Sequence, residues 1–144
     1  MKVKVKKLDP KAVIPTYAKK GDAGLDLTAT SYECSNSGHV YGTGLSIEIP
    51  EGHVGLIFPR SSNRKTQAYL TNSVGVVDSG FRGEVMVTFK NRDTIWDNAN
   101  HRPYEVGDRV AQLIILPYPS IEFTESDVLS ETERGTSGHG STGK

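Results

Sequence analysis

Short apolar runs separated by glycine and proline are the feature that most constrains how this chain can fold. Valine, isoleucine and threonine number 33 against 16 for leucine and alanine, and β-branched side chains fit a pleated sheet better than a helix. Many short strands within 144 residues indicate a single all-β domain, built as a sandwich, jelly roll or barrel. The expected strands are Val3–Leu8, Leu25–Thr30, Leu45–Ile49, Val54–Phe58, Glu84–Phe89 and Arg109–Leu116.

At most one short helix is expected. Ser62–Leu70 is the stretch free of helix breakers, and it is long enough for two turns. Asn91–Arg102 is typical of a polar loop joining two strands, with Trp96 placed to pin it to the body. Ile114–Leu116 is continuously apolar, which predicts a strand buried on both faces and ended by Pro117.

The composition changes after Leu129. Ser130–Lys144 has no aliphatic or aromatic side chain and contains four glycines, three serines and three threonines. Such a segment cannot offset the entropy of ordering by burial. We therefore divide the chain into a β-sandwich at 1–129 and a flexible tail at 130–144, for which a simple disordered terminus is the plain alternative.

Charge and cysteine content restrict the partners. Lysine plus arginine and aspartate plus glutamate each total 17, so no net field draws the chain to nucleic acid or an anionic membrane. Met1–Lys7 alternates lysine with valine, unlike a signal peptide, and no apolar run reaches about 18 residues. The single cysteine, Cys34, excludes an internal disulfide. We expect a soluble protein in a reducing compartment, most simply the cytoplasm, with no nucleic-acid or membrane partner.

Two segments have the composition of a phosphate site. Arg134–Gly143 combines a guanidinium group, hydroxyls and closely spaced glycines, whose backbone N–H groups can turn toward an anion. Ordering it costs about 1–2 kcal/mol per residue, so we expect a lid that closes on a multiply charged ligand. Pro59–Ser62 follows an apolar run where backbone N–H groups favour an anion, although a plain serine cap is the alternative.

Three further segments place polar groups beside predicted strands. Asn72–Glu84 looks like a β-hairpin whose backbone could pair with the edge of a planar ligand, and Asp78 is a candidate base beside it. Ala23–Ala29 sets Asp26 in an apolar stretch, and Gly107–Gln112 ends on a glutamine inside a strand. An ordinary hairpin, a turn aspartate and a structural glutamine are the respective alternatives.

Together these five segments strongly resemble the five motifs of the homotrimeric dUTPase family, in the family's order and over nearly the whole chain. The resemblance implies an antiparallel jelly-roll-like sandwich. It also implies a homotrimer with three active sites, each taking motifs from three subunits and closed by a tail.

The reaction implied by the resemblance is hydrolysis of dUTP to dUMP and pyrophosphate, which limits uracil in DNA and supplies dUMP for thymidylate synthesis. Water attacks the α-phosphorus, with Asp78 as its base and Gln112 helping to hold it. Mg²⁺ chelates the triphosphate, and Asp26 touches the ion through water only. The implied phosphate-binding residues are Arg60, Ser61, Ser62, Arg134, Gly140, Ser141 and Thr142.

The residues implied to bind uracil and deoxyribose are Asn72, Gly75, Val76, Val77, Asp78, Phe81, Met86 and His139. Two of these depart from the family pattern. Phe81 stands where the family usually has tyrosine, and His139 where it has a phenylalanine that covers uracil. Imidazole is smaller and gains a charge in mild acid, so we expect a weaker lid with a pH-dependent KM, which His139→Phe would abolish.

Two other functions compete with dUTP hydrolysis. Enzymes that deaminate dCTP share the superfamily fold and an Arg-Ser-Ser element, and ammonia release from dCTP would identify one. A regulatory protein could keep the pocket as a nucleotide switch. The presence of Asp78 and of a complete tail favours turnover, because a pure sensor needs no base.

Phe81 generates a first prediction. The resemblance implies a ring packed beneath the deoxyribose, where a ribose 2′-hydroxyl has no room, and Phe81 keeps that ring but loses any hydrogen bond of the tyrosine hydroxyl. We predict that the chain continues to reject UTP, as measured by kcat/KM for dUTP and UTP under identical conditions. Comparable values for the two nucleotides would refute steric exclusion by this ring.

Overall fold

The computed structural model describes residues 1–92 and 99–138, which contain ten β-strands and two short 3-10 helices. The helices are η1 (Ser61–Lys65) and η3 (Ala99–His101). The strands are β1 (Lys4–Lys7), β2 (Leu25–Thr28), β3 (Ser31–Ser35), β4 (Gly38–Gly42), β5 (Leu45–Glu48), β6 (His53–Pro59), β7 (Ala68–Leu70), β8 (Gly75–Val77), β9 (Met86–Asn91) and β10 (Arg109–Pro117).

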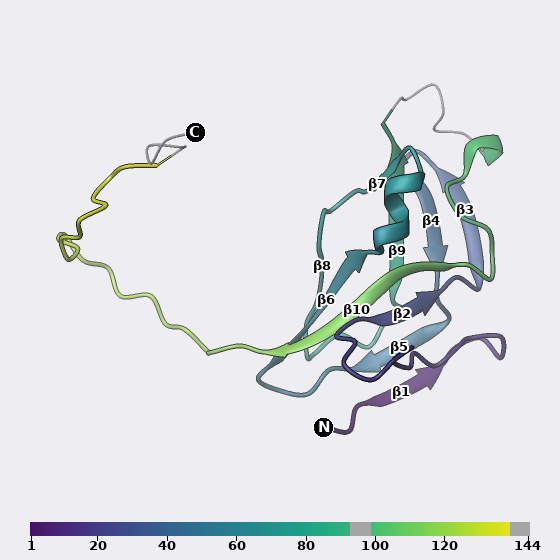
Figure 1. Ribbon diagram of the computed structural model, residues 1–144. Coiled ribbons are helices and arrows are strands. Elements are labelled where there is room, and N and C mark those ends of the chain that lie inside the picture. The colour runs from purple at the N-terminus through teal and green to yellow at the C-terminus, as the bar shows by residue number, and fades with distance from the viewer. Residues whose placement is uncertain (93–98, 139–144) are drawn as a thin grey trace.

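The strands form three sheets, and every pair in the described residues is antiparallel. One sheet has the order β2-β10-β6-β8, a second has the order β3-β4-β9-β7, and β1 pairs with β5 alone (Figure 1). Fully buried side chains from all three sheets build one core, among them Leu27, Tyr41, Leu45 and Phe89. The predicted all-β antiparallel fold is confirmed.

The six expected strands are present, with ends that differ by at most two residues from those predicted. Four strands were not among these six, namely β3, β4, β7 and β8, although β8 falls in the segment expected to form a hairpin. β3 is an edge strand of its sheet and mostly exposed, so its sequence lacks the apolar alternation by which a strand is recognised. β3 is extended because it pairs with β4, which its own residue pattern does not reveal.

The expected helix over Ser62–Leu70 is wrong in its second half. The chain makes only the 3-10 turn η1, and Thr66 is already extended with φ −97° and ψ 165°. Ala68 and Leu70 are buried on either side of the exposed Tyr69, and β7 pairs with β9. Burial of alternate residues against a neighbouring strand has overridden helix propensity here.

The expected hairpin over Asn72–Glu84 is also wrong. β8 pairs with β6 in one sheet, whereas β9 pairs with β4 and β7 in the other. The segment between β8 and β9 therefore connects two sheets and does not turn back on its own strand. The local pattern of two short apolar runs around glycine cannot distinguish these connections.

The strand end Ile114–Leu116 is not buried on both faces within this chain. Ile114 and Ile115 are half-buried, and Leu116 is 45% exposed. β10 lies between β2 and β6, so the backbone is paired on both edges while one face is left partly open. A continuous apolar run thus marks surface that this chain alone does not cover.

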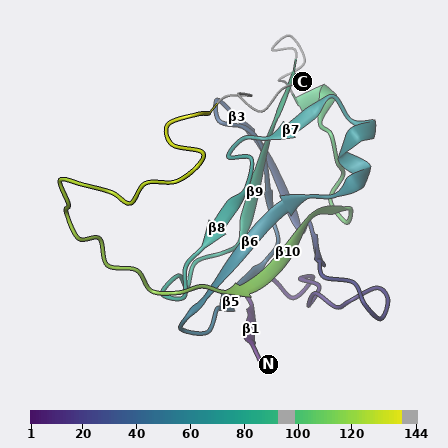
Figure 2. The same cartoon turned by 60° about the vertical axis from the view of Figure 1, so that its left-hand side comes forward.

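Beyond β10 the described residues 118–138 form no helix or strand and are exposed (Figures 1 and 2). The boundary placed at 129 stays a prediction, since the last strand ends at Pro117. The expected loop Asn91–Arg102 contains η3, and Trp96 lies outside the described residues. None of the described helices is long and apolar enough to cross a membrane.

Candidate active site

A pocket of about 240 Å³ lies beside β8 and the loop that follows it. It is lined by every described residue expected to bind uracil and deoxyribose, together with three that were not expected. The expected ones are Asn72, Gly75, Val76, Val77, Asp78, Phe81 and Met86, and the others are Ile57, Glu84 and Val85. One chain thus brings this part of the predicted site together.

The backbone of β8 is suited to reading a planar ligand. β8 is the edge strand of its sheet, so in the described chain its outer N–H and C=O groups have no strand partner. The turn before it is tight, because Ser73 has φ 59° and Val74 N donates to the Asn72 carbonyl at 2.6 Å. A non-glycine residue in the left-handed region is uncommon and fixes how Asn72 enters the pocket.

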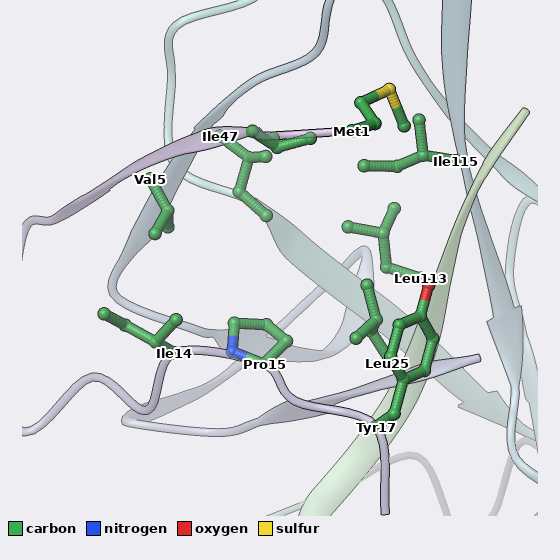
Figure 3. Close-up of a pocket in the computed structure, with 10 residues that line it drawn as sticks. Met1, Val5, Ile14, Pro15, Tyr17, Leu25, Ile47, Leu113 and Ile115 are labelled. Carbon is green, nitrogen blue, oxygen red and sulfur yellow. The ribbon is translucent and has the colours of Figure 1, made fainter. Parts of the chain in front are cut away.

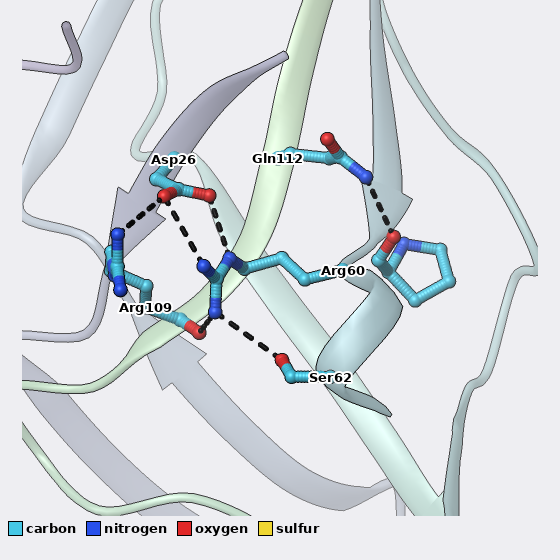
Figure 4. A network of polar contacts seen from close by, with 6 residues as sticks. Asp26, Arg60, Ser62, Arg109 and Gln112 are labelled. Atoms are coloured by element: carbon cyan, nitrogen blue, oxygen red, sulfur yellow. Dashed lines mark hydrogen bonds and ion pairs between the residues drawn. The ribbon is translucent and has the colours of Figure 1, made fainter. Parts of the chain in front are cut away.

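A second group of predicted residues gathers around Asp26 (Figure 4). Arg60 Nε donates to Asp26 Oδ1 at 2.6 Å, and Arg109 Nη1 donates to Asp26 Oδ2 at 3.1 Å. Arg60 Nη1 also donates to Ser62 Oγ and to the Arg109 carbonyl, each at 3.3 Å. The guanidinium group of Arg60 is therefore held in place by a carboxylate before any ligand binds.

Asn63 lies in the same 3-10 helix as Ser61 and Ser62, and its side chain makes hydrogen bonds that hold this helix in place. Tyr104 Oη donates to Asn63 Oδ1 at 3.0 Å, and Asn63 Nδ2 donates to the Ala68 carbonyl at 3.0 Å. Burial raises the pKa of the Tyr104 phenol, while nearby Arg60 opposes that shift. The phenol thus keeps its proton and remains a hydrogen-bond donor to this turn.

Gln112 lies next to this group on β10. Its Nε2 donates to the Pro59 carbonyl at 3.0 Å, which joins it to the end of β6 (Figure 4). The other end of the amide lies against the backbone of Gly24, where an added Cβ would overlap Gln112 Oε1. Gly24 is therefore required for the position of Gln112.

The two groups lie on opposite sides of β6 and at different heights along it. β8 pairs with one edge, where Val77 faces Gly55, while β10 and then β2 lie beyond the other edge. At about 3.3 Å per residue, Asp78 is roughly 15 Å or more along the sheet from Arg60, whose side chain is directed away toward Asp26. One chain does not place both on the same small ligand.

The tail was predicted to close only on a charged ligand, and its described part makes local contacts. Arg134 is exposed, and its Nε donates to the Ser137 carbonyl of the tail itself at 3.0 Å. Residues 118–138 follow an extended course away from the strands (Figure 1). His139, Gly140, Ser141 and Thr142 lie outside the described residues.

Sequence reasoning missed several members of both groups. Glu84 lines the nucleotide-sized pocket and its Oε1 accepts a hydrogen bond from Gly44 N at 2.7 Å. Arg109 shares Asp26, and Gly24 shapes the position of Gln112. Glu84, Arg109 and Gly24 fall inside the five motifs, which located them without assigning them a role. Ile57, Val85 and Gly44 lie outside the motifs.

Asp26 was expected near a magnesium ion. Both of its carboxylate oxygens accept hydrogen bonds from guanidinium groups, which leaves little room for direct coordination. Residues 1–92 and 99–138 contain no group of three or more His, Cys, Asp or Glu able to hold a metal. This donor set fits Mg²⁺ held mainly by waters and ligand phosphates, and it does not fit a cage of protein ligands.

A larger, apolar pocket of about 360 Å³ lies between the N-terminal segment, β5, β2 and β10 (Figure 3). Val5, Leu25, Ile47, Leu113 and Ile115 point into it, and no charged side chain lines it. It has no side-chain cation for a phosphate and no carboxylate to act as a base. Of these two pockets, only the smaller one is lined by carboxylate and amide side chains.

An edge strand beside a small pocket, together with an arginine–serine anchor on the same antiparallel sandwich, defines a nucleotide-binding β protein. The family model for dUTPase matches residues 10–143. The deoxyuridine 5'-triphosphate nucleotidohydrolase of Nocardia farcinica is 40% identical over 146 residues, covering 98% of this chain and 85% of its own. The chain belongs to the dUTPase family.

Solved structures agree with this assignment. A mutant dUTPase of Staphylococcus bacteriophage 80alpha with dUpNHpp gives a TM-score of 0.83 at 28% identity, covering 99% of both chains. A mutant dUTPase from phage phi11 of S. aureus, described for its coordination of a structural Mg(II) ion, gives 0.74 at 25% identity, covering 89% of this chain and 98% of its own.

The contact between Gly24 and Gln112 generates a second prediction. Gly24→Ala should displace the Gln112 amide and lower kcat for dUTP about 10²-fold, as expected when a catalytic group moves by about 1 Å. In a Gln112→Ala background the same change should cost little more, because the amide is already absent. Steady-state kinetics of the four chains of this double-mutant cycle measure it, and additive losses would contradict the proposed contact.

Proposed function

We propose the residues and the mechanism by which this chain, as a dUTPase, hydrolyses dUTP to dUMP and pyrophosphate. The observation that carries the proposal is the pocket beside β8, where an unpaired strand edge, Asn72 and Asp78 surround a space of about 240 Å³. The analogue dUpNHpp in the phage 80alpha dUTPase supports a uracil nucleotide as the ligand.

Uracil binds along the outer edge of β8. The backbone of Gly75–Val77 and the amide of Asn72 offer donors and acceptors to its Watson–Crick edge. Gly75 is buried with its Cα against Ile57, where an added Cβ would lie 3.1 Å from the Ile57 Cβ, so the floor of the pocket is close-packed. Phe81, 43% exposed on the following loop, packs against the deoxyribose.

Asp78 acts as the base that orients and deprotonates the attacking water. It is exposed at the rim of the pocket, directly after the strand that binds the base. A carboxylate in this position accepts the proton as the water attacks the α-phosphorus, and Gln112 helps to hold that water. Displacement at phosphorus then releases pyrophosphate.

Arg60, Ser61 and Ser62 receive the leaving phosphates. The ion pair with Asp26 fixes the guanidinium group in advance, so little reorganisation is needed when charge develops in the transition state. Arg134 and the tail residues Gly140, Ser141 and Thr142 add donors when the tail closes, and His139 covers the base. Mg²⁺ would be held mainly by the ligand phosphates and, through water, by Asp26, and it would neutralise charge on the phosphates.

The active site is assembled from several subunits of a homotrimer. Asp78 and Arg60 of one chain lie too far apart to serve the same triphosphate, whose phosphorus atoms are separated by single bridging oxygens. Exposed Val76, Met86 and Leu116 supply apolar surface that a neighbouring chain could bury. The exposed residues 118–138 supply the length for a tail to reach a neighbour's site.

The cellular compartment is inferred from the reaction and from the free cysteine. Cys34 is an exposed free cysteine on β3, which suits a reducing compartment such as the cytoplasm. Removal of dUTP there limits uracil in DNA and supplies dUMP for thymidylate synthesis. The two-part organisation, with a body at 1–129 and a closing tail at 130–144, belongs to the same proposal.

A third prediction tests the base. Asp78→Asn keeps the size of the side chain but removes its basicity, so pyrophosphate release from dUTP with Mg²⁺ should fall about 10²–10⁴-fold. Wild-type chain assayed in parallel on dCTP, dTTP and UTP should release far less than on dUTP. Equal activity of Asp78→Asn would overturn the assigned mechanism, and ammonia release from dCTP would replace the assigned reaction.

A further inference from the structure

The loop between Asp78 and Gly83 is held from behind by the side chain of Arg82. We propose that Arg82 is a positioning residue, which sets the ring of Phe81 and so controls the preference for deoxyribose over ribose. The inference rests on the proposed function, because it assigns Phe81 to the sugar. Arg82 itself does not line the pocket beside β8.

The side chain of Arg82 makes hydrogen bonds to the backbone of two other residues of the loop. Its Nη1 donates to the Ser79 carbonyl at 2.7 Å and to the Phe81 carbonyl at 2.8 Å. Its own carbonyl accepts a hydrogen bond at 2.7 Å from the hydroxyl of Ser46, which is buried on β5. The loop is therefore joined through Arg82 to a strand of the core.

The loop needs such a clamp. Gly80 and Gly83 lie within it, and glycine loses more conformational freedom on ordering than any other residue. The turn itself has one backbone hydrogen bond of 3.1 Å, from Phe81 N to the Asp78 carbonyl. Two charge-assisted hydrogen bonds from one guanidinium group are stronger than this single neutral bond.

Phe81 depends on the backbone more than a tyrosine would. Its ring lies over Gly83, where an added Cβ would be 2.6 Å from the ring Cζ, and it has no hydroxyl with which to anchor itself. The carbonyl of Phe81, gripped by Arg82, therefore fixes where the ring stands. A ring that moves by a fraction of its width would open space for a 2′-hydroxyl.

Arg82 faces a groove on the other side of the loop, which it lines with Lys6, Ser46 and others. The groove provides a matched control. Arg82→Met keeps the apolar stem and removes the donors, Arg82→Lys keeps a cation, and Lys6→Met removes a cation from the same groove without touching the loop. Thermal unfolding of each variant shows whether it is folded.

Two readouts separate positioning from general stability. The first is the ratio of kcat/KM for dUTP to that for UTP. Arg82→Met should lower this ratio about 10-fold, Arg82→Lys should restore part of it, and Lys6→Met should leave it unchanged. The second is hydrogen exchange of the amides at 79–83, which should be about 10-fold faster in Arg82→Met than in wild type.

The proposal is overturned if Arg82→Met keeps the wild-type ratio, if it lowers both kcat/KM values equally at unchanged exchange, or if Lys6→Met has the same effect. Should Arg82→Met not fold, a wild-type ratio in Arg82→Lys together with wild-type exchange would overturn it equally. Failure of wild type to hydrolyse dUTP would overturn the proposed function, while hydrogen exchange would still test the clamp.

Discussion

The pairing of β6 with β8 along one edge and with β10 along the other fixes the positions of the pocket beside β8 and of the group around Asp26. β8 borders the pocket in which we propose that the base binds, and Arg60 and the turn of serines follow the end of β6 on the far side. Because hydrogen-bonded strands cannot be compressed, the two groups keep a fixed separation. Within one chain, the sheet therefore keeps the two groups too far apart to contact the same small ligand.

The group around Asp26 and the pocket beside β8 differ in their charged and polar groups. Asp26 partly neutralises Arg60 and Arg109, which keeps the two guanidinium groups close together. The pocket beside β8 has no such cation, and its polarity comes from backbone groups, Asn72 and Asp78. The two kinds of surface match the two ends of a nucleotide, which has a planar polar base at one end and concentrated charge at the other, although one chain does not bring both to the same molecule.

The sequence predicted the chemistry better than the connections between strands. Asn72 and Phe81 were assigned through the resemblance to the dUTPase motifs, Asp78 also from its place in the expected hairpin, and all three line one pocket. The predicted partner of β8 was wrong. β8 pairs with β6, which lies about 20 residues earlier, and such a pairing leaves no local mark in the sequence. Likewise, the contacts of Arg109 with Asp26 and of Gly24 with Gln112 join residues whose proximity only the fold creates.

Mixing of inactive chains tests the shared site most directly. Chains carrying Asp78→Asn and chains carrying Arg60→Ala would be unfolded together, refolded at equal amounts, and assayed for pyrophosphate release from dUTP. In a random trimer about one quarter of the shared sites join an intact Asp78 to an intact Arg60, so about one quarter of wild-type activity should return. Activity no higher than that of the separate variants, in mixtures shown to have refolded, would contradict assembly of the site from different chains.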